Sequence, residues 1–416
     1  MRNDVSKLSR EQHLSQAQMF AICTKGDGEF YESLRIKREV FPFMRNDDIS
    51  RTAIEDPLIC FYAESLLRKH KRIQIKNVIS NKMRELGRLL LIIRSATGTN
   101  TFFDAMKPEM FDHFVTATRV ISGYDSETRT FKAGSLALHM GTSLKQVCDI
   151  ATKLVIKKSN VLSYDNQEST LKEIKWLRNL IQNHWNSEIS SLALKNLNEK
   201  RHEKPTFLPL TSDVIKFHKY VKEEANDAKN NLLRENKQKF EYKRLSECVL
   251  ALTLLLNRKR IGEIQYLTVD RYNHSIPQTT QEEFLLTLSS VERKLTSAFK
   301  RVITPGKGSK PVPILFSKDM QNSIELLLRL RNLNISQENQ YLFANPNTDT
   351  SALSGYHTIR KLAERSGVVD KTLFTSNRLR KQIATILQVL NITETEFEQI
   401  AKFMGHTKDT HASFYR

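Results

Sequence analysis

Apolar residues recur every three or four positions through much of the first half of the chain. They fall at Met83, Leu86, Leu90 and Ile93, and the same period returns between residues 171 and 181. This spacing places the apolar side chains on one face of an α-helix. Glycines and short polar runs divide the region into segments of ordinary helix length. The sequence therefore predicts an all-helical domain over residues 61–197.

The second half mixes helical and strand-like patterns. Residues 284–288, 300–303 and 312–316 are rich in strand formers, and the last two flank a Gly-Lys-Gly turn that is typical of a hairpin. Residues 198–212 are charged and contain two prolines, as expected of an interdomain linker. We predict a mostly helical α+β protein with a mixed α/β domain over 213–416. Residues 1–60 are interpreted as an arm or small subdomain.

The charge balance favours a polyanionic partner. The chain of 416 residues has 65 Lys and Arg against 46 Asp and Glu, a net charge of +19. Such an excess favours nucleic acid, whose phosphates bind bases regardless of sequence. No apolar run of membrane-spanning length is present, and the polar start lacks the apolar core of a signal peptide. We expect no membrane association.

The cysteines indicate a reducing location and no zinc module. The four thiols, Cys23, Cys60, Cys148 and Cys248, are scattered and form no Cys-x-x-Cys pair. Each is most simply a buried single thiol. We predict no metal and no cofactor.

Basic residues in the first half have more than one reading. Residues 66–72 form a basic cluster, which is typical of a solvated helix face, a phosphate-contacting element or a nuclear import signal. Arg84 and Arg88 lie between the apolar positions of one helix, and we predict that they face DNA.

Three bases crowd a helix break at Arg258, Lys259 and Arg260. Free amides and the helix dipole attract anions to a helix start, so a phosphate is expected here. Glu263 follows Arg260 by three residues, and on a helix it could hold the guanidinium in one orientation. The alternative is a surface salt bridge of little consequence.

Further candidates follow toward the end of the chain. Lys307 lies at the hairpin tip, from which a lysine can reach into a groove and donate a proton. Arg380 lies at the edge of an apolar helical stripe, and Gly405 is placed to end a later helix just before His406. Tyr415 follows His406 by nine positions.

Taken in order, these residues resemble the tyrosine recombinase (phage integrase) superfamily. The matching pieces are Arg260 through Glu263, the Gly-Lys-Gly hairpin, Leu379-Arg380, Gly405-His406 and Tyr415. Each piece alone is weak, whereas the complete series with its histidine-to-tyrosine spacing is specific. The resemblance spans about residues 205–416. The long helical first half and the ending are similar to the Crypton group of eukaryotic DNA transposons.

The resemblance implies a helical core-binding domain and a mixed α/β catalytic domain that clamp double-stranded DNA. It implies strand exchange through a 3′-phosphotyrosyl bond without metal or nucleotide, a tetrameric synapse and a nuclear location. Tyr415 would be the nucleophile, His406 the base, and Lys307 the acid for the leaving oxygen. Arg260 and Arg380 would clamp the phosphate, with Glu263 and His411 supporting them. The residues assigned to neighbouring DNA phosphates are Arg258, Lys259, Lys310, Arg378 and Lys381.

One position departs from the family pattern. The family's His-x-x-Arg is Asn377-Arg378-Leu379-Arg380 here. Asparagine can donate a hydrogen bond to a phosphate oxygen but cannot titrate. Two alternatives to a recombinase therefore stay open: an inactive DNA-binding protein on the same scaffold, and a type IB-like topoisomerase.

Overall fold

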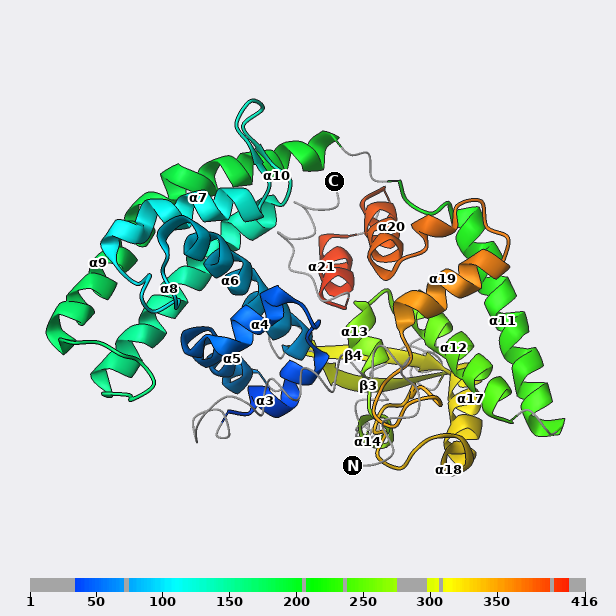
Figure 1. The fold of residues 1–416 in the computed structure, drawn as a ribbon. Coiled ribbons are helices and arrows are strands. Elements are labelled where there is room, and N and C mark those ends of the chain that lie inside the picture. The colour runs from blue at the N-terminus through cyan, green and yellow to red at the C-terminus, as the bar shows by residue number, and fades with distance from the viewer. Residues whose placement is uncertain are drawn as a thin grey trace. The chain divides into compact units, whose positions relative to one another are not determined.

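The computed structural model describes residues 34–70, 75–203, 207–234, 238–274, 298–306, 310–389 and 393–403. The chain divides into two compact units that meet between Pro205 and Thr206. Figure 1 colours them in sequence order, the first unit from blue to green and the second from green to red. Each unit has a hydrophobic core of its own.

Helices form almost all of the described part of the first unit. They are α3 (Ile36–Glu39), α4 (Asp48–Glu55), α5 (Pro57–Lys69), α6 (Ile75–Thr97), α7 (Phe111–Ile121), α8 (Gly134–Ile156), α9 (Gln167–Trp185) and α10 (Ser191–Glu203), with short turns at Phe41–Phe43, Pro108–Met110 and Asn186–Ser190. Helices α6 and α9 bury the apolar stripes that the periodicity predicts. The unit also contains a two-residue hairpin, β1 (Tyr124–Asp125) with β2 (Thr130–Phe131), which the all-helical prediction missed.

Residues 34–60 form neither an arm nor a subdomain of their own, although we expected one or the other. Leu34, Ile36 and Phe41 belong to the same buried core as α6 and α8. The Asp56 carboxylate ties the segment down, because it caps α5 and also accepts a hydrogen bond from the Phe102 backbone N–H at 2.7 Å. The arm interpretation is therefore wrong for these residues.

The second unit surrounds α12. Its elements are α11 (Thr211–Arg234), α12 (Gln238–Asn257), α13 (Ile261–Gln265), α14 (Val269–Asn273), β3 (Phe299–Pro305), β4 (Pro311–Ser317), α17 (Lys318–Arg329), α18 (Arg331–Asn334), α19 (Gly355–Arg365), a turn at Lys371–Leu373, α20 (Ser376–Val389) and α21 (Glu394–Phe403). Helix α12 packs against α11, α17 and α19, and Figure 1 shows it between them. Apolar residues on all its sides are consequently buried.

Strands β3 and β4 form the predicted hairpin. They pair antiparallel from Phe299 opposite Ser317 to Pro305 opposite Pro311. The alternating burial along both strands matches their alternating sequence. The described part of the chain is thus mostly helical with small sheets, which confirms the α+β expectation. The candidate strand at 284–288 lies outside the described residues.

The helices extend into the segment that we interpreted as a linker. Helix α10 continues to Glu203, and α11 begins at Thr211 rather than at 213. The change of unit still falls between these helices. In the described ranges, no helix has both the length and the hydropathy needed to cross a bilayer.

Packing of α8 against the end of α9 leaves no room for a side chain at Gly141. A methyl group there would lie 2.5 Å from Trp185 Cδ1. We expect Gly141→Ala to lower the free energy of unfolding by about 1–3 kcal/mol, as overpacked cores do. Urea denaturation followed by circular dichroism measures this. The matched control, Ser135→Ala at an exposed position of α8, is expected to stay within about 0.5 kcal/mol of the wild type. Equal stability of the two variants would contradict the packing argument.

Candidate active site

Arg260 immediately precedes α13 and is held by Glu263. The Glu263 carboxylate accepts a hydrogen bond from the Arg260 backbone N–H at 3.1 Å and another from Nη1 at 3.2 Å. The glutamate side chain is only 6% exposed, whereas that of Arg260 is 41% exposed. A buried acid therefore orients one side of the guanidinium and leaves the rest accessible. Because one partner is buried, the pair differs from an ordinary surface salt bridge, and the accessible part of the guanidinium could bind an anion.

The Asn257 side chain joins the helix before Arg260 to the hairpin. This fully buried residue donates from Nδ2 to the Leu315 carbonyl at 2.8 Å and accepts from the Leu315 N–H at 2.7 Å. Both hydrogen bonds reach the backbone of β4. The end of α12 and the hairpin are consequently held in one register, only three residues before Arg260.

The described end of the hairpin turn lies beside Glu263. A methyl group placed on Gly306 would approach Glu263 Oε1 to 3.3 Å, and the Gly306 N–H donates to the Lys310 carbonyl at 2.7 Å. The turn residue next in sequence, Lys307, lies outside the described residues. The structure thus brings the neighbour of that lysine to the acid that holds Arg260.

Arg258 connects the same loop to α20. Its Nη1 donates to the Leu379 carbonyl at 3.3 Å, and burial lowers its pKa to about 10. Its backbone has a positive φ of 51°, a strained conformation for arginine that the surrounding contacts maintain. We expected Arg258 to touch DNA, but its guanidinium instead stabilises the junction between the loop and α20.

Arg380 is the next residue of α20 and is 3% exposed. Its charge acts on the Lys259 ammonium, as does that of Glu263. Glu263, which binds Arg260, and Arg380 thus both act on Lys259, although Arg260 and Arg380 are 120 positions apart in sequence. Asn377 is exposed one turn before Arg380 on the same helix.

Lys259 has no exposed surface, so the prediction that it contacts DNA directly is wrong. Its Nζ lies 3.7 Å from the centroid of the Phe403 ring at the end of α21. Burial lowers the pKa of this lysine to about 7.

The first-unit arginines also differ from expectation. Arg84 forms a two-pronged ion pair with Asp47, with Nη1 and Nη2 at 2.6 and 2.7 Å from the two carboxylate oxygens. Because both of its terminal nitrogens are bound to Asp47 within the unit, Arg84 is a poor contact for DNA. The Arg88 Nε donates to the Arg84 carbonyl at 3.4 Å, and the residue is only partly exposed.

The remaining candidates divide into two groups. Lys310 is exposed, Lys381 is partly exposed, and Arg378 Nη1 donates to the Thr372 carbonyl at 2.8 Å. His406, His411 and Tyr415 lie outside the described residues, as does Lys307. The roles assigned to these four stay predictions.

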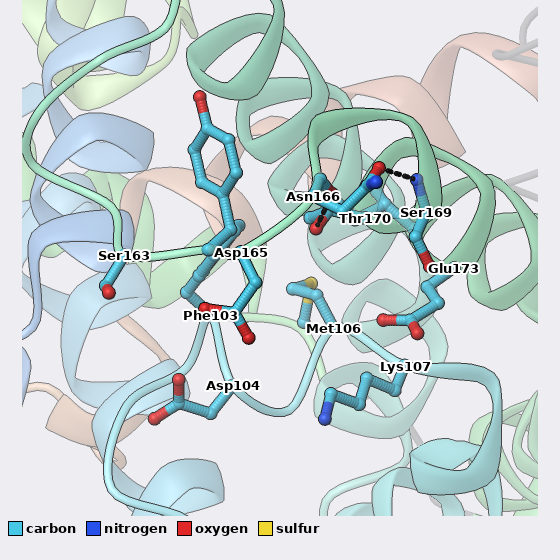
Figure 2. Close-up of a pocket in the computed structure, with 12 residues that line it drawn as sticks. Phe103, Asp104, Met106, Lys107, Ser163, Asp165, Asn166, Ser169, Thr170 and Glu173 are labelled. Atoms are coloured by element: carbon cyan, nitrogen blue, oxygen red, sulfur yellow. Dashed lines mark hydrogen bonds between the residues drawn. The ribbon is translucent and has the colours of Figure 1, made fainter.

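A pocket in the first unit has the wrong charge for a polyanion. It encloses about 280 Å³ between the loop after α6 and the start of α9 (Figure 2). Asp104, Asp165 and Glu173 line it, with Lys107 as the basic side chain. Among the described residues, no cluster of three or more His, Cys, Asp or Glu side chains is arranged to hold a metal ion.

Comparisons with known proteins give weak matches in structure alone. No family model and no curated protein matches the chain. Among solved structures, it is similar at 13% identity to the XerH site-specific recombinase bound to difH substrate in a pre-cleavage complex, with a TM-score of 0.43, covering 100% of this chain and 96% of that chain. The XerH post-cleavage complex with palindromic difH has 13% identity and a TM-score of 0.41, covering 99% and 94%. The XerA recombinase has 13% identity and a TM-score of 0.31, covering 85% and 91%. Because these TM-scores are low, we give the similarity no weight in assigning a function.

Sequence reasoning missed two residues of the site, Asn257 and Phe403. A buried asparagine ending an apolar helix was the available signal for the first, since such an amide must find partners. Nothing in the sequence pairs Phe403 with Lys259, because the contact joins segments far apart.

The two hydrogen bonds from the Asn257 side chain to the Leu315 backbone predict that Asn257→Leu is much less stable than the wild type. The substitution has a similar shape but removes both hydrogen bonds to β4, and it leaves the partly buried N–H and carbonyl of Leu315 without these partners. We expect a loss of about 2–4 kcal/mol in urea denaturation, since each unsatisfied group costs about 1–3 kcal/mol. Asn322→Ala, at an exposed position of α17, is the control and is expected to be neutral. An unchanged free energy of unfolding in Asn257→Leu would show that these two hydrogen bonds do not hold the hairpin.

Proposed function

We propose that this chain is a tyrosine recombinase that cleaves and rejoins double-stranded DNA through a 3′-phosphotyrosyl intermediate. The observation that supports the proposal is that a buried carboxylate, Glu263, orients Arg260, and that this carboxylate and Arg380 both act on Lys259. Two guanidinium groups near one point suit the non-bridging oxygens of a phosphodiester. The net charge of +19 supports a DNA partner.

The proposed reaction is a transesterification. The Tyr415 oxygen attacks the scissile phosphorus, and its proton passes to His406 or a nearby group, because a phenol with a pKa of about 10 needs a base. The P–O5′ bond breaks, and the leaving 5′-oxygen takes a proton from Lys307. Arg260 and Arg380 stabilise the charge of the pentavalent transition state. A 5′-hydroxyl then attacks the tyrosyl ester and restores the phosphodiester without ATP.

The finer assignments belong to the same proposal. Membership of the Crypton group, a nuclear location and a tetrameric synapse rest on the sequence resemblance. Lys310 and Lys381 are proposed to contact DNA phosphates beside the reaction centre. Arg378 is a weaker candidate because it already donates to a backbone carbonyl.

A nicked suicide substrate tests the chemistry. Incubation with a mixture of nicked genomic fragments should give a covalent protein–DNA adduct that Tyr415→Phe abolishes. Arg260→Ala should slow adduct formation by about 10²–10³-fold, as removal of a transition-state donor does. The control is Arg329→Ala, an exposed arginine on α17, which should leave the rate unchanged. Sequencing the trapped DNA would give the target.

The second candidate is an inactive DNA-binding protein, and Asn377 is the observation that favours it. Salt-sensitive DNA binding without any adduct would support this alternative and contradict the enzyme.

Restoring the family histidine provides a separate test. Asn377 is exposed on the first turn of α20, so an imidazole fits there without repacking. If the site is active, Asn377→His should speed adduct formation, because a group with a pKa of about 6.5 can exchange protons near neutrality. The expected gain is greatest near neutral pH, and Asn377→Gln serves as the non-titrating control. Equal rates for the two variants would show that a titrating group at 377 takes no part.

A further inference from the structure

Lys259 is a buried ammonium with an incomplete set of partners. None of its surface is exposed, and no hydrogen-bond partner for Nζ is present among the described residues. Instead, Nζ lies over the face of the Phe403 ring, 3.7 Å from the ring centroid. A cation–π contact returns part of the solvation that burial removes, but less than a counterion would.

The charges around Lys259 do not balance. Glu263 from α13 favours its charged form, and Arg380 from α20 opposes it. Glu263 is already bound to Arg260. The one carboxylate that acts on Lys259 is therefore shared, and the ammonium has no carboxylate of its own among the described residues.

Helix α21 supplies the cover over this charge. Phe403, its last residue, packs against Ala384 and Leu387 of α20, and its ring lies over the Lys259 ammonium. In the docked position, α21 therefore covers this side of Lys259. In sequence, Phe403 precedes His406 by three positions and Tyr415 by twelve.

We propose that Lys259 couples the docking of α21 to the presence of a phosphate between Arg260 and Arg380. Without an anion, docking buries an ammonium that lacks a counterion and is weakened. A phosphate supplies the missing negative charge and makes the docked state more favourable. Lys259 is thus a positioning residue. It makes docking of α21, and of the following segment that contains His406 and Tyr415, favourable when substrate is bound. The proposal rests on the phosphate site of the proposed function.

The pH dependence of docking has a definite sign. Burial lowers the pKa of Lys259 from 10.5 to about 7, and undocking α21 should return it toward the higher value. Between these pH values, docking of α21 releases a proton from Lys259. The free energy of docking therefore becomes more favourable as the pH rises from about 7 to 10.5. Below pH 7 the ammonium is charged in both states, and the cost of docking is fully present.

Hydrogen exchange of residues 393–403 in the full chain tests the coupling. We would compare inorganic phosphate with chloride at equal ionic strength, at pH 6 and at pH 9. In the wild type, phosphate should slow exchange several-fold at pH 6 and much less at pH 9. Lys259→Met, an apolar side chain of similar length, should exchange slowly in chloride and show no response to phosphate. The control, Lys318→Met at an exposed position of α17, should behave as the wild type does.

A second variant keeps the test independent of one substitution. Phe403→Leu retains apolar cover but removes the ring, so exchange should quicken more at pH 6 than at pH 9. A wild type that ignores phosphate, or a Lys259→Met protein that responds as the wild type does, would overturn the coupling. The suicide-substrate assay distinguishes the two proposals. If phosphate slows exchange as expected but no adduct forms, only the enzyme proposal is wrong. If an adduct forms but Lys259→Met responds to phosphate as the wild type does, only the coupling is wrong.

Discussion

The candidate site depends on the amide of Asn257. Its two hydrogen bonds to Leu315 join the end of the central helix α12 to strand β4, and both of these elements lead directly into residues of the site. From this junction the loop continues through Arg258, which holds α20, to Arg260, which Glu263 holds. A neutral amide is well suited to this place. It satisfies a strand donor and a strand acceptor together, without adding charge to a region that is already strongly basic.

Electrostatics then explain why the region differs from an ordinary surface cluster. Surface bases repel one another weakly because water screens them, whereas burial raises the cost of each uncompensated charge. Arg380 and Lys259 are almost completely buried beside a carboxylate that is shared with Arg260. A fold that tolerates this arrangement is less stable than one with apolar residues in the same places. Lys259 in particular has no hydrogen-bond partner for its ammonium among the described residues, and strongly perturbed charges of this kind are typical of functional sites.

The basic residues of the first unit show the opposite case. Arg84 alternates with apolar positions on α6 as a DNA-facing residue would, yet Asp47 satisfies it within the unit. Asp47 also caps α4, and the nearby guanidinium holds the pKa of that carboxyl at about 2. The pair therefore fixes α4 against α6 as part of the fold. A high count of lysine and arginine does not by itself reveal which of them remain available to phosphates.

The sequence by itself determined the local features of this protein. Helical periodicity predicted α6 and α9, the strand formers around Gly306 predicted β3 and β4, and the three-residue spacing predicted the Arg260–Glu263 pair. Each depends on interactions between near neighbours along the chain, which spacing encodes directly. The tertiary structure alone decided that residues 34–60 join the core, that Lys259 is buried and that Asn257 binds β4. Those outcomes depend on contacts between distant segments, since burial and counterions are properties of the packed chain and cannot be read from any one stretch of it.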